Sequence, residues 1–277
     1  MLSEWLMLTA LTWLVGSVAV PVMVMSSPAA QPLRDATRQV RRVHIILGCT
    51  LLIIASIMAL AFPITRYSDG RLVLVLVMRL CLIGLIGASL MRGSRYIGVV
   101  FMAGFALLLM QSLLSRGALQ QDLLAPLAND WLHLTLSTIW VGGLGLLAFV
   151  LVPATLRKPA LQPALSAALE RFSPVAMFCA IGLGLTGILQ ATQVVNGFQG
   201  LVETSYGRLV LAKVGLFAVL VCFGALHQFV IMPRLRPRLF AGVVPLVRTR
   251  FALTIGAELL VSVIVLAISA TLKAAIV

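Results

Sequence analysis

The chain has 277 residues, of which 61% are hydrophobic and only 10% are charged. Soluble domains carry about a quarter of their residues as charged side chains, so this composition excludes a water-soluble globular protein. The net charge is +13. Nucleic-acid binding is also excluded, because the basic residues lie in short connections between apolar segments and form no separate basic domain.

Apolar segments of about 20 residues, enough to cross ~30 Å of hydrocarbon, follow one another along the whole chain. They must be helices, because lipid offers no partner for backbone N–H and C=O groups. We therefore predict an all-α, polytopic membrane helical bundle of about eight transmembrane helices. Their ranges are 5–25, 44–63, 72–91, 96–115, 131–152, 172–194, 208–231 and 251–272. Glu4 directly precedes the first range, and residues 1–25 contain no Lys or Arg, which favours a retained helix over a cleaved leader.

The connections between these segments predict the topology. Fourteen of the 21 Lys and Arg residues lie in the odd-numbered connections. They are Arg34, Arg38, Arg41, Arg42, Arg92, Arg95, Arg157, Lys158, Arg171, Arg234, Arg236, Arg238, Arg248 and Arg250. Basic connections face the cytoplasm, so both termini are expected in the periplasm of a Gram-negative bacterium. Residues 1–130 and 131–277 are interpreted as two four-helix halves of one integral membrane unit.

Three charged residues fall inside predicted membrane helices: Arg79, Lys213 and Glu258. Each costs at least ~2.5–3.5 kcal/mol at the centre of a membrane helix, so each needs a structural or functional reason. Two interpretations stay open. Glu258 forms a structural ion pair with Arg79 or Lys213, or its carboxylate lines a polar pathway for a cation or a proton.

Polar side chains recur at helical spacing in the last three predicted helices, and such stripes should face the bundle interior. One stripe is Thr186, Gln190 and Gln193; another is Thr254, Glu258, Ser262 and Ser269; a face spaced by seven residues is Tyr206, Lys213, Leu220 and His227.

The three histidines, His44, His133 and His227, all lie near predicted helix ends. His133 is expected at the outer end, and His44 and His227 at the cytoplasmic end. Their spacing does not specify a metal site, and an interfacial histidine is usually a hydrogen-bonding residue. Methionine and cysteine suit Cu(I), but here they fit ordinary packing. No motif of a soluble enzyme is present, and we expect none of its activities.

The second half of the chain carries a recognisable combination of motifs. His133 is followed after six residues by Trp-x-Gly-Gly, and Thr-x-Tyr-Gly precedes Lys213 by a short interval. The residues concerned are His133, Trp140, Gly142, Gly143, Thr204, Tyr206, Gly207, Lys213, Pro233 and Glu258. Over about residues 131–272, this combination resembles the copper resistance protein D family.

The resemblance implies a multi-pass protein of the bacterial inner membrane that moves copper, as Cu(I) or Cu(II), into the cytoplasm. It also implies a periplasmic copper-binding protein of the CopC type as partner. On this hypothesis His133 accepts the ion, a polar route passes Lys213 and Glu258, and His227 and His44 receive it. The metal-binding candidates are His133, His227, His44 and Glu258. The pathway or structural candidates are Lys213, Tyr206, Arg79, Gln190, Gln193 and Trp140.

Two other functions remain open. The chain could be a membrane redox protein that holds haem b or a quinone, with His44 and His227 as the axial pair because they share a predicted depth. It could also be a non-transporting membrane partner of a periplasmic copper chaperone, since a fold does not fix a function. The oxidation state of copper, the energy source and the oligomeric state, a homo-oligomer included, are not predicted.

Overall fold

The computed structural model describes residues 2–61, 71–92, 96–114, 124–194, 197–231 and 244–275, and these are helical apart from short turns. The helices of the first half are α1 (Leu2–Val24), η1 (Pro28–Ala30), α2 (Gln31–Ala36), α3 (Arg38–Ala61), α4 (Arg71–Arg92) and α5 (Ile97–Ser112). Those of the second half are α6 (Leu124–Leu146), η4 (Leu147–Leu151), α7 (Val152–Arg157), η5 (Pro159–Leu161), α8 (Gln162–Thr192), α9 (Gly197–Glu203), α10 (Ser205–Leu226), η6 (His227–Ile231) and α12 (Val244–Ala275). The prediction of an all-α fold is confirmed.

Seven helical segments in the described residues are long and apolar enough to cross a membrane. Each of the eight predicted ranges overlaps a helix, but α5 is shorter than expected, with 16 residues. At 1.5 Å per residue this is about 24 Å, less than the ~30 Å of a hydrocarbon core. The count of about eight full spans is therefore corrected to seven candidate spans and one shorter apolar helix. The chain is a multi-pass membrane protein.

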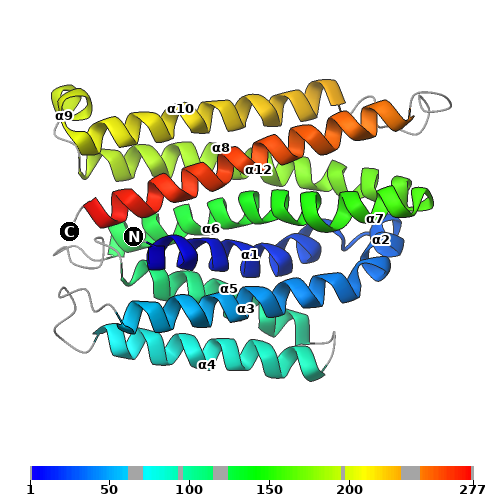
Figure 1. Cartoon of the computed structure of the whole chain (residues 1–277), viewed down its shortest axis with the longest axis horizontal. Coiled ribbons are helices and arrows are strands. Elements are labelled where there is room, and N and C mark those ends of the chain that lie inside the picture. Colours follow the sequence, from blue (N-terminus) through cyan, green and yellow to red (C-terminus); the bar gives the residue numbers. More distant parts are fainter. Residues whose placement is uncertain are drawn as a thin grey trace.

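The helices lie roughly parallel, and both termini lie at the same end of the bundle (Figure 1). We call this end the termini end. The opposite end, where α2 and α7 lie, is called the basic end because it carries exposed arginines such as Arg38 and Arg157. This arrangement agrees with the prediction that the two termini share one side of the membrane and that the basic connections lie on the other. Which compartment each end faces stays a prediction.

Helix α1 forms the centre of the bundle and α10 lies at its edge (Figure 1). Most of α1 is buried, and it packs chiefly against α3 and α6. In α10 only Gly207 and Leu220 are buried, so most of that helix is left to face lipid. Because α1 contacts helices from both halves, it joins them into one packed unit.

Glycine permits a close crossing between α1 and α6. A Cβ atom on Gly142 would lie 2.6 Å from the Cα atom of Gly16, and one on Gly143 would lie 2.4 Å from the ring of Phe172. No larger residue fits either position without movement of its neighbour. The two adjacent glycines in α6 therefore allow its close packing against α1 and α8.

Two turns of π-helix occur where spans approach a proline. The turn η4 precedes Pro153, and the turn η6 begins at His227 and lies just before Pro233. Proline removes a backbone donor from a helix, and a wider turn accommodates that loss. The π-helical turn at His227 is of interest because such turns are frequent at functional sites.

Candidate functional site

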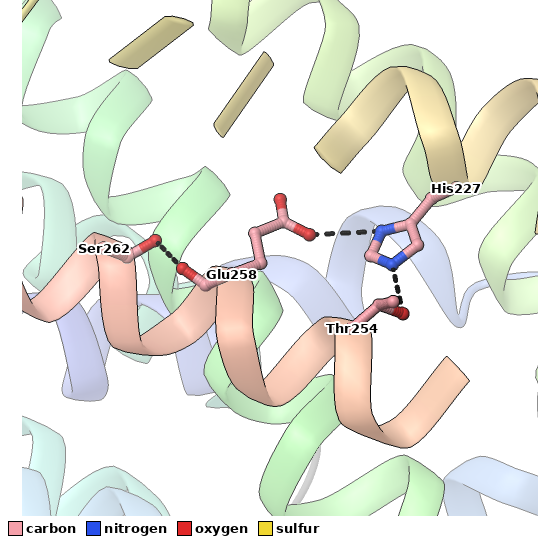
Figure 2. A network of polar contacts seen from close by, with 4 residues as sticks. All are labelled: His227, Thr254, Glu258 and Ser262. Carbon is pink, nitrogen blue, oxygen red and sulfur yellow. Dashed lines mark hydrogen bonds and ion pairs between the residues drawn. The ribbon is translucent and has the colours of Figure 1, made fainter. Parts of the chain in front are cut away.

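A polar cluster joins the turn η6, which directly follows α10, to α12 towards the basic end, and its centre is Glu258. The side chain of Glu258 is only 1% exposed. Its Oε2 atom lies 3.1 Å from Nδ1 of His227, and Nε2 of the same ring lies 2.9 Å from the hydroxyl of Thr254. Figure 2 shows the ring lying between the two α12 side chains, which are one turn apart. The hydroxyl of Ser262 donates to the backbone carbonyl of Glu258 at 2.9 Å.

The occupied ring nitrogens determine what this cluster can do chemically. Nδ1 of His227 faces a carboxylate and therefore carries a proton, while Nε2 is engaged by a hydroxyl. A metal ion could bind His227 only after displacing one of these partners. The arrangement is a buried ion pair when the imidazole is protonated and a close polar contact when it is neutral.

This partner corrects the prediction that Glu258 pairs with Arg79 or Lys213. Arg79 is fully buried in α4, and its guanidinium donates to Sδ of Met7 at 2.9 Å and to Oε1 of Gln111 at 2.9 Å. The amide of Gln111 in turn donates to Glu4 at 3.4 Å. Arg79 therefore belongs to a separate cluster of α1, α4 and α5, where a glutamine stands between the two opposite charges.

A second polar group joins α6 and α8 near the termini end. Nδ1 of His133 lies 2.8 Å from the hydroxyl of Thr186, whose own proton goes to the carbonyl of Gly182 at 2.7 Å. One turn nearer the end, the amide of Gln190 donates to Asp130 at 3.4 Å. The predicted inward stripe on α8 is thus correct for Thr186 and Gln190 and wrong for Gln193, which is exposed where the helix ends.

An apolar layer lies between these two polar groups. Trp140 of α6 is 4% exposed, and its ring meets that of Phe217 of α10 edge to face, with centroids 6.0 Å apart. The Phe217 ring also approaches Gly184 of α8. Trp140 is about 10 Å along α6 from His133, and Phe217 is about 15 Å along α10 from His227, at 1.5 Å per residue. The two polar groups therefore lie on opposite sides of the aromatic pair.

His44 lies outside both polar groups. Its ring stacks on that of Trp13, with centroids 5.2 Å apart, and its Nδ1 atom lies 2.8 Å from the carbonyl of Val40 in its own helix. Figure 1 shows α3 and α10 on opposite sides of α1 and α6. The structure does not bring His44 and His227 together, so the predicted axial pair for haem is wrong, whereas the role of each histidine in receiving copper stays a prediction.

Comparison with known proteins adds evidence from sequence. Residues 166–272 match the family described as Copper resistance protein D (CopD). This C-terminal region is similar to the CopD family. It contains α8, α10 and α12, and therefore both His227 and Glu258. His133 and the Trp-x-Gly-Gly motif precede the matched residues, although the motif was part of the resemblance found in the sequence.

Individual proteins that are similar to this chain carry related descriptions. It is 35% identical over 127 residues to the Copper transport protein CutJ of Bacillus subtilis (strain 168), which is 44% of this chain and 22% of that protein. It is 30% identical over 152 residues to the Inner membrane protein YebZ of Escherichia coli (strain K12), 53% of this chain and 50% of that protein. The Copper resistance protein D of Pseudomonas syringae pv. tomato is 29% identical over 137 residues, 48% of this chain and 44% of that protein.

The chain thus spans half or less of the length of these relatives. No solved structure matches it.

The Thr-x-Tyr-Gly motif of the CopD-like region has a structural explanation. The hydroxyl of Thr204 accepts from the backbone N–H of Gly207 at 2.9 Å and so caps the start of α10. A Cβ atom on Gly207 would lie 2.3 Å from the carbonyl oxygen of Gly200, so only glycine lets α9 and α10 come this close. Tyr206 and Lys213 are half-buried along α10, and each makes further contacts.

Three polar residues with clear partners were not singled out from the sequence: Glu4, Gln111 and Asp130. Glu4 and Gln111 lie near the ends of apolar segments, where polar residues are ordinary, so only the position of Arg79 in space reveals them. Asp130 was detectable, because it lies three residues before His133 and therefore on the same face of α6.

Within the described ranges, no group of three or more His, Cys, Asp or Glu side chains could hold a metal ion.

Proposed function

We propose that this protein moves copper ions across the bacterial inner membrane into the cytoplasm. The family described as Copper resistance protein D and the relative named as a copper transport protein support copper as the substrate. The relative named as an inner membrane protein supports the location. The orientation of the basic end towards the cytoplasm rests on the positive-inside rule.

One observation carries the proposal: the buried contact between His227 and Glu258 inside the CopD-like region. Ionisable side chains that face the interior of a membrane bundle are expensive and usually mark the path of an ion or a proton. Glu258 is almost completely buried. Its partner His227 begins the turn η6, within the span Ser205–Val230, which has the smallest buried share of the candidate spans in the described residues. A peripheral helix can move away from α12 with little loss of packing, which would expose the carboxylate to an arriving ion.

The proposed route runs from His133 at the termini end, past Trp140 and Phe217, to Glu258 and His227. In the arrangement described, the aromatic pair separates the two polar groups, so movement of α10 is needed for passage. Lys213 precedes Phe217 by one turn on α10, and its charge would repel a copper ion by roughly 4 kcal/mol per unit charge at ~4 Å in an effective dielectric of ~20. We therefore place the route along the α6 and α8 side of the aromatic pair.

The test is copper uptake into vesicles that contain the purified chain and a copper-sensitive dye. Glu258→Gln and His133→Ala are expected to lower the initial rate at least about tenfold, because each removes a ligand or charge from the route. Glu170→Gln is the control, since this carboxylate is exposed on α8. Unchanged uptake in both variants would contradict the proposal. Binding of a periplasmic copper-binding protein of the CopC type without any uptake would favour the docking function instead.

A further inference from the structure

Four arginines gather where α2 meets α3, at the basic end of the bundle (Figure 1). We call this group the arginine corner and define it as Arg34, Arg38, Arg41 and Arg42. Arg41 is half-buried and the other three are exposed. Leu33, the neighbour of the first arginine, is completely buried and holds α2 against the bundle. The arginine corner is therefore a fixed part of the molecule and not a loose connection.

The charges of the arginine corner are not compensated within the described part of the chain. None of the four arginines forms an ion pair there, and the one acid among them, Asp35, is exposed, so residues 34–42 carry a net charge of +3. The guanidinium of Arg41 donates to the backbone carbonyl of Arg34 at 3.1 Å, while its Nε atom is buried without a hydrogen-bond partner. The charges of Arg34 and Arg38 repel that of Arg41, and that of Asp35 attracts it.

The position of the arginines on α3 adds to this excess of positive charge. Helix α3 begins at Arg38, and its first turn contains no acidic residue. The N-terminus of a helix carries a partial positive charge, which favours an anion and disfavours a cation such as Arg38 or Arg41. The helix and the guanidinium groups therefore favour the same kind of ligand, an anion with several oxygen acceptors.

An exposed apolar stripe on α3 continues from the arginine corner. Arg38, Arg42 and Ile46 follow one another at intervals of four residues and so share one face of the helix. The stripe consists of hydrophobic side chains that are 44% to 58% exposed: Val43, Ile46, Leu47, Ile54 and Ile57. The candidate membrane span Arg38–Ala59 begins at the corner. The arginines therefore lie at the level of lipid headgroups, and the stripe lies beside the acyl chains.

We infer that the arginine corner binds the headgroup of an anionic phospholipid, whose acyl chains lie along the exposed stripe of α3. Guanidinium groups bind phosphate oxygens through paired N–H donors, and a phosphodiester would supply the negative charge that this part of the chain lacks. Clusters of four or more basic residues beside a membrane span are typical of anionic-lipid binding. A free phosphate ion could use the arginines only, whereas a phospholipid uses both the arginines and the stripe.

The experiment measures lipid binding to the full chain in detergent by native mass spectrometry. The chain is titrated with phosphatidylglycerol or with phosphatidylcholine of the same acyl chains. We expect the first phosphatidylglycerol to bind at least about tenfold more tightly than phosphatidylcholine. Replacing two exposed arginines together, Arg38→Gln with Arg42→Gln, should raise the Kd for phosphatidylglycerol about tenfold or more and leave that for phosphatidylcholine unchanged.

The matched control is Arg157→Gln with Lys158→Gln. It removes the same charge from exposed positions at the same end of the bundle and should leave both Kd values unchanged. Arg38→Lys with Arg42→Lys keeps the charge and should keep most of the preference for phosphatidylglycerol.

Three results would overturn the inference. One is equal binding of the two lipids by the wild-type chain. Another is an equal rise of the Kd in the control pair, which would mean that the overall charge of the basic end attracts the lipid. The third is displacement of phosphatidylglycerol by millimolar inorganic phosphate, which would identify a site for a free anion. Size-exclusion profiles check that each variant is folded, and the exposure of the replaced side chains leads us to expect unchanged profiles.

Discussion

The Nδ1 atom of His227 lies 3.1 Å from Oε2 of Glu258, and this contact ties the peripheral helix α10 to α12. The carboxylate is buried, whereas the histidine side chain is 15% exposed. The two residues are 31 positions apart in the sequence, in separate predicted spans. The contact therefore has consequences for both the stability of the bundle and the movement of α10.

The first prediction concerns the stability of this pair. Glu258→Ala should lower the free energy of unfolding in detergent by about 3 kcal/mol, because it leaves the His227 ring facing an apolar cavity without its acceptor. His227→Ala should have a similar effect by leaving a buried carboxylate unpaired. The double variant should cost less than the sum by about 1–3 kcal/mol. Additive effects would mean that the contact contributes no coupling.

The second prediction concerns Gln111, the residue between Arg79 and Glu4. Gln111→Leu has a similar volume but removes the acceptor of a fully buried guanidinium, so unfolding in detergent should become easier by about 3 kcal/mol. Gln193→Leu is the matched control, because this glutamine is exposed at the end of α8 and should change stability by less than about 0.5 kcal/mol. Equal stability of the two variants would show that Arg79 finds another partner.

The sequence predicts the helices of the fold better than it predicts the contacts of the site. The apolar ranges predict the helices well, because the length of a membrane span is fixed by the hydrocarbon thickness. The predicted spans also show that Glu258 lies inside a membrane helix and that His133 lies near the end of one, so both residues could be identified as unusual. Their partners were not, because Glu258 meets His227 and Arg79 meets Gln111 through contacts between helices that the order along the chain does not specify.

Helix periodicity also has limits near the ends of spans. It correctly placed Thr186 and Gln190 inside, but Gln193 lies where α8 ends and the neighbouring helix no longer covers it. His44 and His227 share a predicted depth, yet depth says nothing of position around the bundle. The stacking of His44 on Trp13 of α1 shows how two residues at one depth can belong to different sides.

The third prediction concerns the crossing of α1 and α6. Gly142→Ala should lower the free energy of unfolding by about 1–3 kcal/mol, because the new methyl group would meet the backbone at Gly16 and push the helices apart. Gly215→Ala provides the matched control. No atom lies within 4 Å of a Cβ atom at that position, so a change there should be neutral or slightly stabilising. A destabilisation at Gly215 that equals the one at Gly142 would show that the loss at Gly142 does not come from its close contact with Gly16.

The last prediction concerns the aromatic pair between the two polar groups. Phe217→Ala should raise the leak of protons and copper through vesicles, because it removes the ring that closes on Trp140 and leaves space that water can enter. A pH-sensitive dye inside the vesicles measures the leak without any copper. Phe178→Ala removes the same ring from a position that is 69% exposed and should leave the vesicles tight. If Phe217→Ala vesicles stay as tight as those of the control while copper uptake persists, the ion does not pass this layer, and the route must run elsewhere in the bundle.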